Sequence, residues 1–172
     1  LRRAHSEFGA EIHSFVLMSN HYHLLISTPN ANISAIMQAF NSRTSHALTA
    51  AGNRINMTYG GRYQKSIIRN DRHFHCAYKY IYRNPVHGGA VSAVENYRYS
   101  SLRQKLGLDK VQIPLTRDRI LFPDVDSALI WLNQKPIDSH WNDVKRAMHR
   151  PEFRLPMDKC SKRPHRLESV QF

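Results

Sequence analysis

The chain has only two cysteines among its 172 residues, Cys76 and Cys160, and they stand far apart in the sequence. So few cysteines exclude a disulfide-rich scaffold and a zinc module built mainly from cysteine, and they suit a reducing compartment. Long apolar runs are missing as well, so the sequence predicts no membrane-spanning helix.

Acidic residues are scarce: 13 Asp and Glu stand against 25 Lys and Arg, which gives a formal net charge of +12. Eleven histidines come in addition. A positive surplus of this size favours a polyanionic partner, and nucleic acid fits better than a membrane surface. Charge alone does not separate an enzyme that acts on nucleic acid from a protein that only binds it. With 41% apolar and 22% charged residues, the chain is globular and long enough to bury a core.

Hydrophobic patterning predicts an antiparallel hairpin near the start of the chain. The segment Glu11–Met18 is mostly apolar and is typical of a buried strand, and Ser19-Asn20 is a turn pair. The segment His21–Ser27 alternates as a second strand. Its two faces carry Tyr22, Leu24 and Ile26 on one side and His21, His23 and Leu25 on the other.

The remainder of the chain is predicted to be mainly helical. Asn32 is expected to cap a helix that ends at Gly52. Asn70 or Asp71 is expected to cap a helix that runs through Tyr82, because helices usually stop before a proline such as Pro85. The other predicted elements are a helix end over Leu1–His5 stopped by Gly9, a third strand over Arg62–Arg69, and helices over Tyr99–Leu106, Val125–Asn133 and His140–His149.

Two short segments contain residues suited to chemistry. His21 and His23 point to the same face of a strand, so both imidazoles can reach one metal ion; the alternative is a pair of histidines on a half-exposed strand. Tyr80 and Asn84 are neighbours on one helix face and combine a nucleophile with an amide oxygen. The alternative here is an aromatic face packed on the sheet, with Asn84 as a C-terminal cap.

The two segments read Met-Ser-Asn-His-Tyr-His-Leu-Leu over 18–25 and Tyr-Ile-Tyr-Arg-Asn-Pro-Val over 80–86. In this combination the chain resembles the HUH-superfamily single-tyrosine transposases, and most closely the REP-associated tyrosine transposases. HUH stands for His-hydrophobic-His, with Tyr22 in the middle position. The segments Gly61–Gln64 and Tyr97–Leu102 are also similar to patterns of that group. The resemblance covers roughly Leu1–Leu106.

The resemblance implies an α+β fold, a ferredoxin-like sandwich with a central antiparallel sheet flanked by helices. Relatives have a first strand before the segment that matches Leu1, so we expect that strand to be missing here and the sheet to have an open edge. We divide the chain into an N-terminally truncated HUH transposase catalytic domain, residues 1–106, and a mainly helical C-terminal extension with a basic tail, residues 107–172.

The resemblance also implies residue roles. His21 and His23 would bind a divalent metal ion, Mg²⁺ or Mn²⁺, Asn84 would supply a third ligand, and Tyr80 would be the nucleophile. The partner would be single-stranded or hairpin DNA, cleaved and rejoined near hairpins through a 5′-phosphotyrosine intermediate. The expected protein is a monomer or homodimer in the bacterial cytoplasm, without a membrane partner.

Basic and aromatic side chains around this site are candidates for DNA contacts. Tyr63 and Phe74 would stack on unpaired bases. Lys159–Arg166 is a basic tail that either neutralises phosphates or only adds charge to the surface. The basic candidates are Arg43, Arg62, Lys65, Arg69, Arg72, Lys79 and Arg83.

Two other functions remain open from the sequence. A relaxase or replication initiator shares the histidine pair and the tyrosine, but such enzymes usually carry a helicase or further tyrosines, and 172 residues leave no room for a helicase. A catalytically impaired transposase remnant would only bind DNA, and the missing first strand favours this alternative. Nicking of a hairpin-flanked oligonucleotide would separate the remnant from the enzyme.

Overall fold

The computed structural model describes residues 1–52, 59, 61–110, 112–157 and 163–168. These residues form an α+β structure with a two-stranded antiparallel sheet and six α-helices, and none of the helices is long and apolar enough to cross a membrane. The elements are α1 (Arg2–Phe8), β1 (Glu11–Leu17), β2 (Tyr22–Ser27), α2 (Ile33–Gly52), α3 (Asp71–His87), η1 (Val94–Asn96), α4 (Ser101–Lys105), α5 (Val125–Asn133), α6 (Asp138–Met148) and η2 (Arg166–Glu168).

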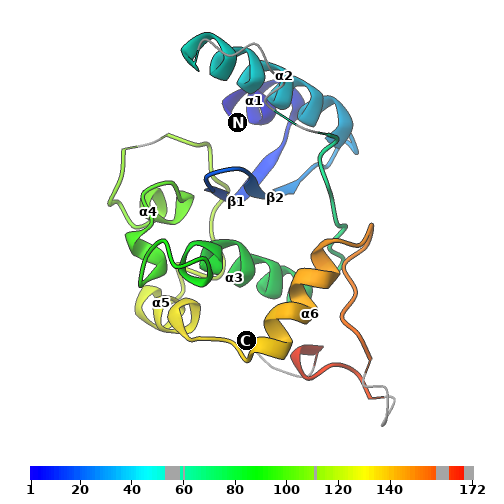
Figure 1. Cartoon of the computed structure of the whole chain (residues 1–172), viewed down its shortest axis with the longest axis vertical. Coiled ribbons are helices and arrows are strands. Elements are labelled where there is room, and N and C mark those ends of the chain that lie inside the picture. Colours follow the sequence, from blue (N-terminus) through cyan, green and yellow to red (C-terminus); the bar gives the residue numbers. More distant parts are fainter. Residues whose placement is uncertain (53–58, 60, 111, 158–162, 169–172) are drawn as a thin grey trace.

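The predicted hairpin is confirmed and lies between two helical layers, α1 and α2 on one side and α3 on the other (Figure 1). Side chains of the second strand point alternately to these two layers, as the sequence pattern predicts. The Tyr22 hydroxyl donates a 2.8 Å hydrogen bond to Asn41 Oδ1 of α2, whereas Leu25 is buried in the core on the α3 side. The strand register shifts between Ile12 and Ser14, which makes a β-bulge.

One hydrophobic core joins the N-terminal and C-terminal parts of the chain. Val16 of β1 and Ile81 of α3 belong to the same buried cluster as Trp141 of α6 and Phe153. A smaller cluster packs α1 and α2 against the other face of the hairpin. The predicted C-terminal extension therefore packs directly against the elements of the predicted catalytic domain.

The two edges of the hairpin differ. The outer edge of β1 is covered, because Leu17 N donates to the Tyr99 carbonyl (2.9 Å) and Thr116 N donates to the Ile12 carbonyl (2.8 Å). Within the described residues, β2 forms backbone hydrogen bonds with β1 and with no other strand. The outer edge of β2 is thus open, as expected for this sheet.

The predicted third strand over Arg62–Arg69 is wrong. This segment contains a single bridge, between Ile67 and Glu152, and it runs beside the C-terminal extension instead of the sheet. Ile67 N donates to the Pro151 carbonyl (3.0 Å), and Phe153 N donates to the Ile67 carbonyl (2.9 Å). The segment therefore finds its backbone partner more than eighty residues later in the chain, which local patterning does not reveal.

Two of the predicted helix ends also differ from the structure. Asn70 caps α3 by accepting from His73 N (2.8 Å), but α3 continues through Pro85 to His87. Pro85 is fully buried in the last turn, where packing offsets the one hydrogen bond that proline removes. Asn32 precedes α2 but does not cap it with its side chain, because Asn32 Oδ1 is buried without a hydrogen-bond partner among the described residues while Nδ2 donates to the Phe8 carbonyl (2.9 Å).

The predicted helices of the C-terminal part are confirmed as α4, α5 and α6, with boundaries that differ by at most two residues. The predicted basic tail lies partly outside the described residues, which exclude Lys159 and Lys162. Its described end is attached to the rest of the protein. His165 Nε2 lies 3.0 Å from Asp143 Oδ2 of α6.

Candidate active site

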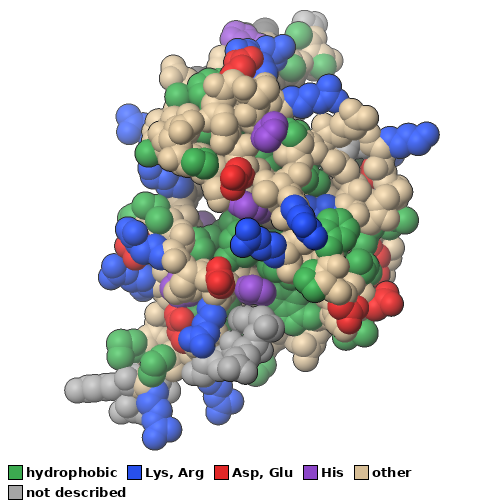
Figure 2. Space-filling model, turned by 180° about the vertical axis from the view of Figure 1, so that it is seen from behind, with side chains coloured by type: hydrophobic (Ala, Val, Ile, Leu, Met, Phe, Trp, Pro, Cys, Tyr) green, Lys and Arg blue, Asp and Glu red, His purple; other side chains and the backbone are tan. Residues whose placement is uncertain are grey.

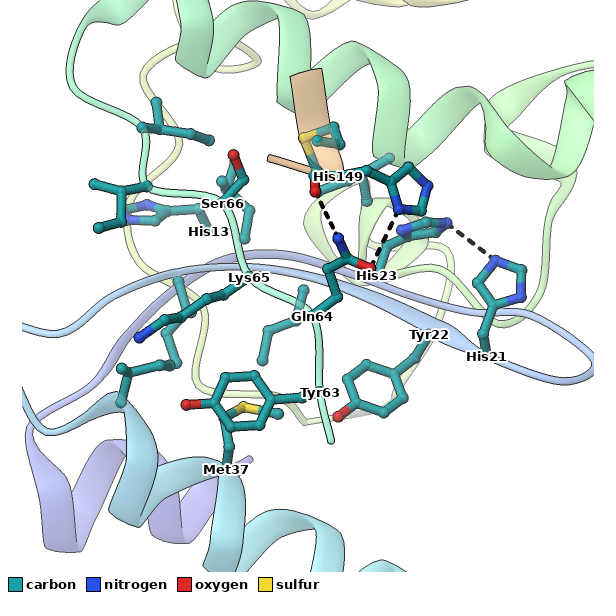
Figure 3. Close-up of a pocket in the computed structure, with 18 of the residues that line it drawn as sticks. His13, His21, Tyr22, His23, Met37, Tyr63, Gln64, Lys65, Ser66 and His149 are labelled. Atoms are coloured by element: carbon teal, nitrogen blue, oxygen red, sulfur yellow. Dashed lines mark hydrogen bonds between the residues drawn. The ribbon is translucent and has the colours of Figure 1, made fainter. Parts of the chain in front are cut away.

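A cavity of about 940 Å³ lies between β2, α2, α3, the segment 61–68 and the end of α6. Both candidate histidines and Tyr80 line it. Figure 3 shows His21 and His23 near His149 on one side of this cavity, with Tyr22 and Tyr63 below them. The residues that the sequence singled out thus border one shared space.

The two candidate metal ligands converge. Nε2 of His21 lies 3.2 Å from Nε2 of His23, and the two rings stand at 90° with their centroids 4.8 Å apart. His21 is exposed, and its Nδ1 lies 2.7 Å from Asn20 Oδ1. Because a carboxamide oxygen only accepts, this contact puts the proton on Nδ1 of the neutral His21 ring and leaves the lone pair on Nε2, the atom that faces His23.

Tyr80 and Asn84 approach the histidine pair from α3. The Tyr80 ring meets the edge of the His23 ring at a centroid distance of 5.7 Å and an angle of 83°. The Asn84 amide donates a 3.0 Å hydrogen bond to the Tyr80 carbonyl, one turn earlier in α3. His21, His23 and Tyr80 therefore meet at one end of the cavity, and Asn84 lies beside them without lining it.

Burial sets the protonation state of this group. Burial, with a smaller contribution from the neighbouring His21, lowers the pKa of His23 to about 4, against an opposing effect of the Asn84 hydrogen bond. Burial also raises the pKa of Tyr80, while a hydrogen bond with Asn84 acts in the opposite direction. At neutral pH His23 is therefore a neutral imidazole, the form that binds metals, and Tyr80 is a protonated phenol.

The geometry fits a divalent ion held by two imidazoles. Two nitrogen ligands about 2.1 Å from one ion, at angles of about 90–110°, lie about 3 Å apart, close to the 3.2 Å between the two Nε2 atoms. The described residues contain no group of three or more His, Cys, Asp or Glu side chains suited to a metal. The Asn84 amide lies beside His23, where its oxygen could serve as a third ligand.

Residues 1–87 match the family model described as "Transposase IS200 like". The match covers half of the chain and includes the hairpin, α2 and α3. The chain belongs to this transposase family. No curated protein and no solved structure matches the sequence significantly. The family supports an enzyme that acts in DNA transposition, and the part of this transposase from residue 88 onward lies outside the match.

The predicted DNA contacts fall into two groups. Arg62 and Lys65 of the transposase are exposed and line the cavity beside Tyr63, whose hydroxyl lies 3.3 Å from the Ser34 hydroxyl. Arg69 is exposed at the end of the same segment and forms a 3.1 Å ion pair with Glu152. Figure 2 shows Lys and Arg side chains at the top, along the left edge and in the middle of one face of the molecule, so the basic surface is not limited to the cavity.

The other predicted contacts lie outside the cavity or are partly buried in the core. Arg43 and Arg72 are exposed on α2 and α3 but do not line it. Lys79 is half-buried with Nζ 5.0 Å from the Trp131 ring centroid, and burial lowers its pKa to about 8. Phe74 lines the cavity but also packs against the core.

Arg83 is not a DNA contact in this structure, and this prediction is corrected. Its side chain is 7% exposed and donates hydrogen bonds to the carbonyls of Leu132 (3.2 Å) and Asn133. These carbonyls end α5, where a guanidinium satisfies acceptors that have no partner within the helix. Arg83 therefore joins α3 to α5 inside the protein.

The sequence did not predict two residues that lie near the candidate site. Both belong to α6 or follow it directly, far along the chain from the two motifs. His149 lines the cavity and is held by Gln64, whose amide donates to the His149 carbonyl (2.7 Å) while Oε1 lies 3.2 Å from His149 Nδ1 (Figure 3). Trp141 packs on the Tyr80 ring with a centroid distance of 4.6 Å. Neither lies near a motif, so only the tertiary contact reveals them.

Proposed function

We propose that this transposase is a single-tyrosine enzyme of the HUH type, most similar to the REP-associated group, that cleaves and rejoins single-stranded DNA next to hairpins. The observation that carries the proposal is the convergence of Tyr80 with His21 and His23 at one end of a basic-lined cavity. A nucleophile beside a pair of imidazole metal ligands is the arrangement that phosphoryl transfer to a tyrosine requires.

Tyr80 performs the covalent step. Its hydroxyl oxygen attacks the scissile phosphorus in line with the bond to the 3′ oxygen, a phosphorus–oxygen bond to Tyr80 forms, and the bond to the 3′ oxygen breaks. The phenol loses its proton and the leaving oxygen gains one, so the products are a 5′-phosphotyrosine and a free 3′-hydroxyl. Because the phosphodiester bond is exchanged and not hydrolysed, a second 3′-hydroxyl can reverse the step without ATP.

His21, His23 and Asn84 would hold the divalent ion, Mg²⁺ or Mn²⁺. When bound, the ion would supply positive charge that stabilises the oxygens of the scissile phosphate. Burial keeps His23 neutral at pH 7, so this ligand needs no deprotonation before it binds. Because burial also raises the pKa of Tyr80, the phenol stays protonated until a substrate is in place.

The substrate would be single-stranded at the site. Arg62 and Lys65 line the cavity and would pair with phosphates, while the neighbouring Tyr63 would stack on an unpaired base. Tyr80 and His23 of the same chain are in contact, which supports a monomer that carries a complete site.

The test is covalent capture of DNA. The protein is incubated with a labelled oligonucleotide that carries a hairpin and an unpaired flank, with Mg²⁺, with Mn²⁺ or with EDTA, and analysed on a denaturing gel. We expect a protein–DNA adduct only with metal, and none with Tyr80→Phe, although that variant still binds the DNA. Binding without any adduct from the wild-type protein would favour the DNA-binding remnant and reject the proposal.

A further inference from the structure

The Tyr80 ring is enclosed by aromatic groups from two parts of the chain. His23 of β2 meets it edge to face, and Trp141 of α6 lies against it at a centroid distance of 4.6 Å and an angle of 31°. Tyr80 is 6% exposed and Trp141 is 5% exposed. Trp141 lies outside the residues that match the family model, so nothing in the family match explains this contact.

Trp141 is itself held in place along α3. Its indole stacks on His87 with a centroid distance of 4.3 Å and an angle of 26°. Tyr80 and His87 are seven residues apart, two turns along one face of α3, so the indole bridges both rings. Val144 and Ala147 are buried on the same side of α6, which keeps this face of the helix against the core.

The C-terminal end of α6 is attached to the other wall of the cavity. The Ser66 hydroxyl donates to the Ala147 carbonyl (3.2 Å), and the Gln64 amide donates to the His149 carbonyl (2.7 Å). These bonds connect α6 to the segment that lines the cavity opposite β2. The helix that carries Trp141 is thus fixed at the core and at the site.

We propose that Trp141 is a positioning residue that holds the Tyr80 ring so that its hydroxyl faces His21 and His23; this inference rests on the proposed function. A tyrosine on a helix has two common side-chain orientations, and a flat indole packed against the ring restricts its movement. In-line attack needs the oxygen within a few tenths of an ångström of its place, and a 1 Å displacement costs about a hundredfold in rate. The C-terminal extension thereby completes the active site.

The first test compares two substitutions at Trp141. Phe keeps a flat ring against Tyr80, whereas Leu fills much of the space without one. We expect Trp141→Leu to lower the single-turnover rate of adduct formation by about tenfold or more, with unchanged affinity for the oligonucleotide, and Trp141→Phe to restore most of the rate. Trp131→Leu is the matched control, because it removes the indole of α5 that lies beside His75 and Lys79 of α3, and it should keep the wild-type rate.

A purely structural role of Trp141 predicts a different pattern. In each of the Trp141→Leu, Trp141→Phe and Trp131→Leu variants, the rate of adduct formation would then fall only in proportion to the drop in melting temperature. Equal rates for the Leu and Phe variants at a temperature where both are folded would overturn the proposal.

A second measurement tests the contact without relying on catalysis. In a Trp131→Phe background, Trp141 is the only tryptophan, and its emission should be that of a buried indole. Tyr80→Ala should shift the emission to longer wavelength, whereas Tyr99→Ala, which removes an exposed tyrosine that packs beside Tyr97, should not. A missing shift would overturn the positioning role, whereas a missing adduct in the wild-type protein with this shift present would reject only the proposed function.

Discussion

The Tyr78 hydroxyl donates a 2.5 Å hydrogen bond to Asp118 Oδ2, and both side chains are buried in the core. Lys105 forms an ion pair with the same carboxylate. The tyrosine two residues before Tyr80 therefore belongs to a polar group that joins α3 and α4 to the C-terminal extension. Four residues after Tyr78, the Tyr82 hydroxyl lies 3.0 Å from the Ser101 hydroxyl, also inside the protein.

This arrangement predicts which tyrosine forms the adduct. Tyr78→Phe and Tyr82→Phe should keep covalent DNA capture, while Tyr80→Phe should abolish it. Tyr78→Phe should also lower the free energy of unfolding by about 1–3 kcal/mol, because the buried carboxylate loses a donor. Denaturant unfolding measures the stability, and the denaturing gel measures the adduct. An adduct that persists in the Tyr80 variant would move the nucleophile to another residue.

The lowered pKa of His23 predicts that the stability of the metal-free protein depends on pH. The pKa of His23 is about 4 in the folded state and about 6.5 in an unfolded chain. Since the folded state binds the proton less readily, the full free energy of unfolding is present above about pH 6.5. As the pH falls toward 4, the free energy of unfolding drops by roughly 3 kcal/mol in total. Urea unfolding in EDTA across this range measures it. His23→Gln should flatten the dependence, and an unchanged slope would contradict the assignment.

Substitution of Arg83 should affect stability but not DNA binding, whereas substitution of the cavity residues Arg62 and Lys65 should affect DNA binding but not stability. Arg83→Met should destabilise the protein by about 2 kcal/mol, because the carbonyls at the end of α5 lose a charged donor, and should leave the salt dependence of DNA binding unchanged. Arg62→Gln and Lys65→Gln should leave the melting temperature unchanged and lower the salt slope by about 0.7 for each lost phosphate contact. Calorimetry and DNA titrations at several salt concentrations separate the two patterns.

The basic tail is best tested by neutralising its charges. Truncation after Met157 would also remove His165 and Glu168, which contact Asp143 and His73. Substitution of all four cations by Gln keeps these contacts. If the tail binds phosphates, DNA binding should weaken evenly across sequences and its salt slope should fall by about 0.7 per contact; an unchanged slope means that the tail only adds surface charge. The four residues are Lys159, Lys162, Arg163 and Arg166.

Local periodicity was enough to predict the parts of the site that lie close together in sequence. His21 and His23 share a face because side chains alternate along a strand, and Tyr80 and Asn84 share a face because a helix repeats every 3.6 residues. These relationships depend only on neighbouring residues. The hairpin, the α5 boundaries and the Asn70 cap followed from the same kind of local signal.

Contacts between distant segments were decided only by the tertiary structure. The segment around Ile67 has the composition of a strand, yet its backbone bonds to Pro151 and Phe153. Arg83 has the charge of a DNA contact, yet it is buried against the end of α5. The sequence alone determined which side chains carry the proposed chemistry, whereas the packing of α6 on α3 decided that Trp141 lies against Tyr80, because such contacts depend on which surfaces the whole chain can bury together.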